Sequence, residues 1–174
     1  MKQPIWQEAA SFAARRHLHQ VRKDGRTPYV AHPFRVAMTV RDLFGESDPE
    51  ILCAALLHDL IEDTPTDYDT IRNKFGTRVA DLVVALTKDM RLPEELREPA
   101  YDRQLADAEW GAKLIKLADV FDNLCDTALP SLRSKALDKA KRALDLAGDD
   151  PRLATAAAKV RTLILACHAD SADA

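Results

Sequence analysis

Glycine is scarce in this sequence, with five residues among 174, and neither a GxxxxGK[ST] nor a GxGxxG pattern is present. Both patterns hold phosphate through backbone amides that only glycines at fixed positions leave open. Their absence excludes a P-loop and a dinucleotide-binding turn. A phosphorylated ligand would have to be held by side chains, a metal ion or helix ends.

Cysteine is also sparse. Cys53, Cys125 and Cys167 lie far apart among apolar neighbours, and no CxxC pair suggests a thiolate zinc site. We expect small buried hydrophobes in a reducing cytoplasm. The N-terminal segment lacks a signal-peptide core, and no apolar run approaches the roughly 18 residues that span a bilayer. The sequence therefore predicts a cytoplasmic protein with no membrane partner.

The charge balance is mild, with a formal net charge of −3. This argues against a broad surface for nucleic acid, although a local basic pocket for a small polyanion stays possible. A chain of this length suits one domain with a sizeable core, and we expect a single domain over residues 1–174. The sequence does not indicate an oligomeric state.

Apolar residues recur at helical spacing along most of the chain, and no useful length alternates as a strand would. Proline, glycine and capping residues divide this pattern into successive helices. We expect an all-α fold, with a loop and a shorter, exposed helix over 89–108. The other expected helices cover about 5–21, 33–44, 49–62, 67–76, 77–86, 109–128, 131–147 and 151–168.

The stretch over residues 54–65 begins as an apolar run and ends in four ionisable side chains, His58, Asp59, Glu62 and Asp63. At about 100° per residue, all four share one face of the expected helix. Carboxylates this close repel one another and are costly to bury without a partner. A divalent cation would remove that repulsion, so we interpret the stretch as part of a metal site with spare carboxylates.

Two residues elsewhere suit the same ion. His32 stands at a helix entry, and Asp119 has apolar neighbours on both sides, where a carboxylate needs a partner. From spacing alone, a capping histidine and an exposed aspartate stay open as alternatives. With His58 and Asp59 they would supply two imidazoles and two carboxylates, a set that suits Mn²⁺ and similar ions.

Glu62 and Asp63 lie one helical turn beyond the histidine–aspartate pair and cannot easily join the same ligand shell. They could instead orient or deprotonate a water whose pKa the metal lowers, which suits attack on phosphorus. Arg22, Lys23 and Lys116 could hold a polyanionic substrate. No Ser-His-Asp or Cys-His arrangement stands out.

Three segments carry a specific resemblance: HLHQVRKDGRTPYVAHP over 17–33, HDLIEDT over 58–64 and KLADVFDNL over 116–124. In order and spacing they resemble successive motifs of the RelA/SpoT-type alarmone hydrolase domain, within the HD metal-dependent phosphohydrolase superfamily. The motif-bearing part covers about 5–129 and the C-terminal helices follow over 131–168. The length resembles that of the stand-alone small alarmone hydrolases of the metazoan SpoT-homologue type.

The resemblance implies an HD-domain helical bundle that uses Mn²⁺ to remove the 3′-pyrophosphate from (p)ppGpp, the alarmone of the stringent response. The partner would be a small nucleotide rather than a nucleic acid. Glu62 and Asp63 would activate water. The metal ligands would be His32, His58, Asp59 and Asp119, and the substrate-binding residues Arg22 (on the purine), Lys23, Asn123, Lys135 and Lys139.

The sequence departs from the family at several positions. His19 stands where glycine is usual, Val120 where arginine or lysine is common, and Lys135 and Lys139 align roughly with an arginine and a tyrosine. These differences leave related specificities open, namely (p)ppApp hydrolase, NADPH 2′-phosphatase and nucleotidase. A non-catalytic nucleotide-binding module is the further alternative, although it would not need Glu62 and Asp63.

Overall fold

The computed structural model describes residues 4–126 and 130–172. Every regular element within these ranges is helical, as the sequence predicts. The expected domain ends and the expected helix end near residue 128 fall outside these ranges. The elements are α1 (Ile5–Arg16), α2 (Ala31–Met38), a π-helical turn η1 (Thr39–Leu43), α3 (Pro49–Leu57), α4 (Leu60–Asp63), α5 (Tyr68–Phe75), α6 (Thr77–Leu86), α7 (Glu94–Ala106), α8 (Trp110–Cys125), α9 (Pro130–Ala147), a 3₁₀ turn η2 (Pro151–Leu153) and α10 (Ala154–Ala172).

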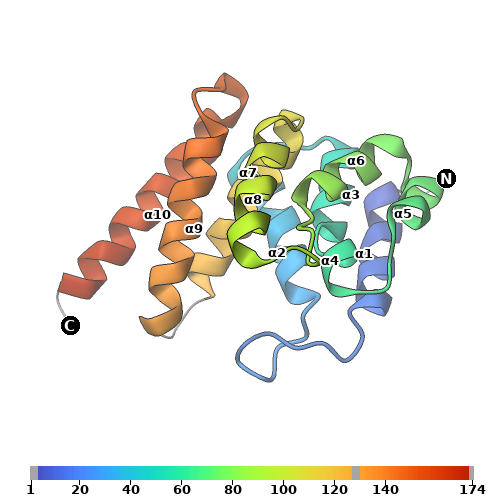
Figure 1. Ribbon diagram of the computed structural model, residues 1–174, viewed down its shortest axis with the longest axis horizontal. Coiled ribbons are helices and arrows are strands. Elements are labelled where there is room, and N and C mark those ends of the chain that lie inside the picture. Colours follow the sequence, from blue (N-terminus) through green and yellow to red (C-terminus); the bar gives the residue numbers. More distant parts are fainter. Residues whose placement is uncertain (1–3, 127–129, 173–174) are drawn as a thin grey trace.

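Helix α8 occupies the middle of the bundle (Figure 1). It contacts α2, α3 and α6 on the side of the N-terminal helices, and α9 and α10 on the other side. The chain therefore runs from the α1 end of the molecule to the α10 end, with α8 between the two halves. Any residue on α8 that faces α2 and α3 lies at the centre of the fold.

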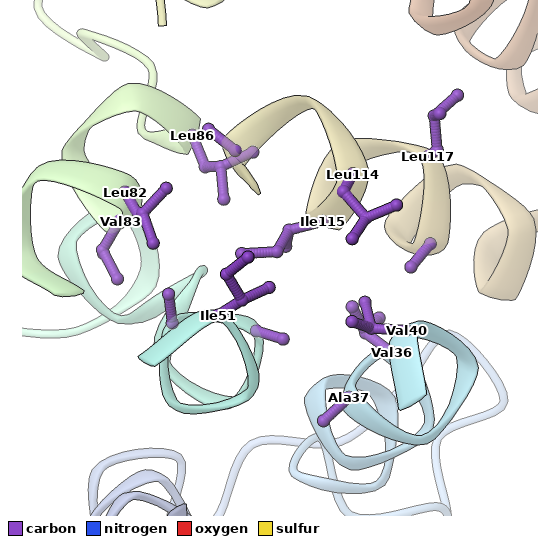
Figure 2. Packing of buried hydrophobic residues seen from close by; sticks show 14 of the residues in the cluster. Val36, Ala37, Val40, Ile51, Leu82, Val83, Leu86, Leu114, Ile115 and Leu117 are labelled. Carbon is purple, nitrogen blue, oxygen red and sulfur yellow. The ribbon is translucent and has the colours of Figure 1, made fainter. Parts of the chain in front are cut away.

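Helix α3 is the most deeply buried element, because every residue from Ile51 to Leu57 is buried. A helix that is apolar all round belongs in a core rather than at a surface. Asp48 begins it by accepting hydrogen bonds from the amides of Glu50 and Ile51, and Pro49 takes the first helical position. Figure 2 shows Ile51 of α3 in the cluster formed with side chains of α2, α6 and α8.

A close helix contact sets the height of α8 above α3. A Cβ atom added at Gly111 would lie 3.1 Å from Cδ1 of Ile51 and 3.3 Å from Cδ2 of Leu82. Only glycine allows this approach without a shift of the neighbours. Gly111 thus brings the start of α8, two turns before Asp119, directly against the α3 core.

The expected continuous helix over 49–62 is wrong. Helix α3 ends at Leu57, and a turn at His58 and Asp59 precedes α4. Asp59 has φ −94° and ψ −3°, in the bridge region where turns and many active-site residues lie. At the break, Nδ1–H of His58 donates to the carbonyl oxygen of Ala55, and Oδ2 of Asp59 accepts a hydrogen bond from the hydroxyl of Tyr29. Asp59 therefore leaves the helical face on which its sequence position would place it.

Two smaller expectations also change. The first helix ends at Arg16 rather than near residue 21. Helix α7 has 13 residues and buries Tyr101 and Leu105, so the region is more helical and less exposed than its polar composition suggests. None of the helices in the described ranges is both long enough and apolar enough to cross a membrane.

Candidate metal centre and phosphate pocket

The histidine–aspartate turn faces the start of α2 and the middle of α8. His32, His58 and Asp59 each present one ligand atom, and these atoms all lie within 4.8 Å of one another. Asp119 of α8 joins them, because its Oδ1 lies 3.2 Å from Nε2 of His32 and 4.0 Å from Nε2 of His58. The structure thus brings together the four side chains that the sequence proposes as metal ligands.

His58 has the geometry of a metal ligand. Its Nδ1–H donates to the carbonyl oxygen of Ala55 at 2.8 Å, which leaves Nε2 unprotonated in the neutral ring. That Nε2 is buried and has no hydrogen-bond partner in the described part of the chain. An orphaned buried nitrogen is costly, and a metal ion would satisfy it. The residues present therefore fit a divalent cation.

His32 is oriented by a carboxylate that the sequence reasoning gave no role. Its Nδ1–H donates to Oδ2 of Asp122 at 2.7 Å, and the guanidinium of Arg35 donates to both Asp122 oxygens at 2.6 and 2.9 Å. Nε2 of His32 is left to face Asp59 and Asp119. In the sequence, the feature that could have pointed to this role is the spacing of Asp122, which follows Asp119 by three residues on the same face of α8.

The charges around this cluster favour a cation. Burial alone would lower the pKa of His32, but Asp119 and Asp122 together raise it to about 9. Burial alone would raise the pKa of Asp59, but the histidines, His58 above all, hold it well below the ordinary value. Charged carboxylates thus draw positive charge onto the imidazoles. A metal ion would take the place of those protons, since ligating histidines must be neutral at the metal-binding nitrogen.

The pKa values of Glu62 and Asp63 are shifted upward, in the opposite direction from that of Asp59. Burial raises the pKa of Glu62, and the nearby Asp59 and Asp63 add to the effect. Burial and the charge of Asp59 likewise raise the pKa of Asp63. Oε2 of Glu62 accepts the backbone N–H of Lys88 at 3.0 Å, which holds the carboxylate in place. Carboxylates with raised pKa values are stronger bases, as water activation requires.

A pocket rich in lysine lies beside the cluster, between α8 and α9. Its cationic side chains come from the 17–30 segment (Lys23), α8 (Lys116) and α9 (Lys135 and Lys139). Lys116 already donates to Asp119 Oδ2 at 2.8 Å. Partial desolvation and the charges of Lys88 and Lys116 lower the pKa of Lys139. Several ammonium groups facing one cavity suit a polyanionic ligand.

Asn123 and Arg22 connect this pocket to the 17–30 segment. Asn123 lines the pocket and donates to Oδ1 of Asp119 at 2.6 Å. Arg22 donates to Oδ1 of Asn123 and to Oδ2 of Asp126, both at 2.9 Å. Arg22 does not line the pocket itself, and its guanidinium lies over the ring of Tyr29 instead.

The backbone conformation of His19 bears on its departure from the glycine that is usual in the family. Its φ is +70°, in the left-handed region that glycine occupies at no steric cost. The glycine that is usual at this position in the alarmone hydrolases would therefore suit the turn that His19 makes after α1.

A histidine–aspartate pair at the centre of an all-helical bundle, completed by a histidine and an aspartate from other helices, defines the HD class of metal-dependent hydrolases. The sequence profile of the HD domain matches residues 9–171, and the chain belongs to this family.

Its relatives share more than the fold. Human guanosine-3′,5′-bis(diphosphate) 3′-pyrophosphohydrolase MESH1 is 46% identical over 120 residues, which cover 68% of this chain and 67% of that protein. The guanosine-3′,5′-bis(diphosphate) 3′-pyrophosphohydrolase of Aquifex aeolicus is 41% identical over 121 residues, covering 68% of this chain and 17% of that longer protein. The solved structure of a metazoan ortholog of SpoT that hydrolyzes ppGpp superimposes with a TM-score of 0.81 at 31% identity, over 94% of this chain and 95% of that one. The resemblance to alarmone hydrolases is thereby confirmed.

Proposed function

We propose that this chain is a Mn²⁺-dependent (p)ppGpp 3′-pyrophosphohydrolase, built as one HD-type hydrolase domain over residues 1–174. Asp119 carries the proposal, because it belongs to both parts of the site. Its Oδ1 lies 3.2 Å from Nε2 of His32, and its side chain also lines the lysine-rich pocket. A polyphosphate held by that pocket would meet the metal site directly. The names of the relatives supply the substrate class.

The metal ligands in this proposal are His32, His58, Asp59 and Asp119. A mixed imidazole and carboxylate set suits Mn²⁺, which accepts both nitrogen and hard oxygen donors. When bound, the ion would supply positive charge against the phosphate oxygens and a lowered pKa for an attacking water. Proton transfer and substrate binding are carried out by side chains of the protein.

Glu62 and Asp63 act as the bases that take the proton from the attacking water. Burial is the main cause that raises the pKa of each carboxyl, which makes each carboxylate a stronger base. The water attacks the phosphorus attached to the 3′-oxygen, the O3′–P bond breaks, and pyrophosphate leaves with the water oxygen. Glu62 or Asp63 then returns a proton to the nucleoside oxygen.

Substrate binding divides between two regions. Lys23, Lys135 and Lys139 hold the phosphates from the walls of the pocket, and Asn123 contacts the sugar-phosphate part. Arg22 stacks on the purine with the guanidinium face that points away from Tyr29, since a planar guanidinium packs on aromatic rings from either side. A cytoplasmic location stays a prediction from the sequence.

Product analysis with a panel of substrates tests the proposal. Purified protein with Mn²⁺ is incubated separately with ppGpp, pppGpp, ppApp, NADPH and dAMP. We expect pyrophosphate from the 3′-diphosphate nucleotides and no turnover by the His58→Ala variant. Orthophosphate released from NADPH or dAMP, with the 3′-diphosphates left intact, would contradict the proposal and favour a phosphatase.

A further inference from the structure

Tyr29 touches both halves of the site, and neither the proposed catalytic roles nor the proposed metal ligands include it. Its hydroxyl donates to Oδ2 of Asp59 at 2.7 Å. Its ring lies under the guanidinium of Arg22, whose Cζ is 5.5 Å from the ring centroid. One end of the side chain therefore contacts a metal ligand, and its flat face carries the cation assigned to the purine.

The ring is held in place from several sides. The His17 ring packs against it with centroids 4.7 Å apart, and the His32 ring meets it edge to face at 5.9 Å. Its backbone N–H donates to the carbonyl of Gln20 at 2.9 Å. A side chain surrounded in this way has little freedom to rotate, so its hydroxyl defines a fixed point.

The segment that carries Tyr29 is tied to the other side of the metal turn as well. His17 Nδ1 and Gln20 Oε1 lie 2.6 Å apart in a hydrogen bond, and Gln20 Nε2 donates to the carbonyl of Asp63 at 2.9 Å. The 17–30 segment thus contacts both ends of the stretch from Asp59 to Asp63. This arrangement fixes the phenol relative to the carboxylate that it meets.

A fixed donor determines how Asp59 can present its oxygens. The phenol uses part of the acceptor capacity of Oδ2, while Oδ1 lies 3.2 Å from Nε2 of His58. A hydrogen bond to one oxygen of a ligating carboxylate orients the group and keeps it ionised.

We propose that Tyr29 is a positioning residue that aims Asp59 at the metal through its hydroxyl and supports Arg22 through its ring. The hydroxyl half concerns metal affinity, and the ring half, which rests on the proposed function, concerns nucleotide affinity. The two halves separate chemically, because phenylalanine keeps the ring and removes only the donor.

The test compares Tyr29→Phe with Tyr29→Leu and with a matched control. Tyr68 of α5 supplies the control, because its hydroxyl also donates to an aspartate, Asp81, at 2.8 Å, but in an exposed hydrogen bond. Calorimetry measures the Kd for Mn²⁺ and, in the presence of EDTA, the Kd for GDP. Thermal unfolding in EDTA reports the stability of each metal-free variant.

We expect Tyr29→Phe to weaken Mn²⁺ binding by about tenfold or more, as loss of an orienting partner does in other metal sites. Its GDP affinity and metal-free Tm should match those of the wild type. Tyr29→Leu should weaken both Mn²⁺ and GDP binding, and Tyr68→Phe should change neither.

Unchanged Mn²⁺ affinity in Tyr29→Phe would overturn the proposal. Parallel losses of Mn²⁺ affinity, GDP affinity and Tm in Tyr29→Phe would also overturn it, because Tyr29 would then only stabilise the fold. Failure of the proposed function looks different. A wild type that binds Mn²⁺ through a Tyr29-dependent site but leaves ppGpp intact would refute the hydrolase and retain the positioning role.

Discussion

Nδ1 of His32 and Oδ2 of Asp122 lie 2.7 Å apart, in a contact that joins α2 to α8 underneath the candidate metal centre. Both side chains are buried, and Arg35 donates to both oxygens of the carboxylate. A carboxylate behind a ligating histidine fixes the ring orientation and makes its free nitrogen more basic. The pair therefore connects the packing of the bundle to the strength of metal binding.

Replacement of that carboxylate should weaken the metal site. We expect Asp122→Asn to raise the Kd for Mn²⁺ by about 10- to 100-fold, because an amide neither carries charge nor sets the histidine tautomer. Calorimetric titration measures this, with Asp145→Asn on the exposed side of α9 as the control. Equal Mn²⁺ affinities in the two variants would refute the role assigned to Asp122.

Glu62→Gln should separate chemistry from metal binding. The amide cannot accept a proton, so we expect kcat to fall by about 10²- to 10⁴-fold while the Mn²⁺ Kd stays at the wild-type value. Steady-state kinetics at saturating metal, with metal content checked in the same samples, measures both quantities. Normal turnover by this variant would show that Glu62 is not the base.

The pH dependence of the wild type follows from the same residue. Burial raises the pKa of Glu62 above its ordinary value of 4.5, and only the deprotonated carboxylate can accept a proton. Activity should therefore fall, as pH decreases, at a pH above 4.5. The profile is recorded over pH values at which bound Mn²⁺ stays constant. A kcat that stays flat down to pH 4.5 would contradict this prediction.

Lys139 and Lys141 provide a matched pair on α9. Lys139 lines the pocket, whereas Lys141 is exposed and does not line it. We expect Lys139→Ala to raise KM for ppGpp about tenfold through loss of a charge-assisted phosphate contact. Lys141→Ala should leave KM unchanged at the same ionic strength. Similar KM values for both variants would place the phosphates elsewhere.

Asp48, which begins α3, should make stability depend on pH. Burial alone would raise its pKa, but Arg78 and the amides of Glu50 and Ile51 lower it below 3.8. The charged Asp48 therefore contributes fully to stability at pH values above 3.8, its pKa in the unfolded chain. This contribution is lost as pH falls through the lower pKa of the folded state. Asp48→Asn keeps a capping oxygen but removes the charge. The difference in unfolding free energy between wild type and variant, measured in urea, should shrink on acidification. A difference that stays constant with pH would refute this role of Asp48.

Residue types and spacing were enough to predict the helical class. They also selected four side chains, His32, His58, Asp59 and Asp119, that the structure brings together. The break between α3 and α4 could not be predicted in this way. It is accompanied by a hydrogen bond from Tyr29, which reaches Asp59 across 30 positions of sequence. Helical periodicity describes only neighbours within one helix.

The supporting residues were missed for the same reason. Arg35 and Asp122 are 87 positions apart, and only the packing of α2 on α8 brings them into contact. From the sequence, Asp122 was one polar residue among several on its helix face. The lysine pocket was easier to anticipate, since the family resemblance pointed to the start of α9 even though the residue types differ.

Hydrolysis of ppGpp in water enriched with ¹⁸O tests the central claim most directly. The Mn²⁺-loaded protein is incubated with ppGpp, and mass spectrometry follows the label in the products. Attack of an activated water on the phosphorus at the 3′-oxygen predicts pyrophosphate with one ¹⁸O atom and GDP with none. Label in the nucleoside, release of orthophosphate instead of pyrophosphate, or intact ppGpp would contradict the account.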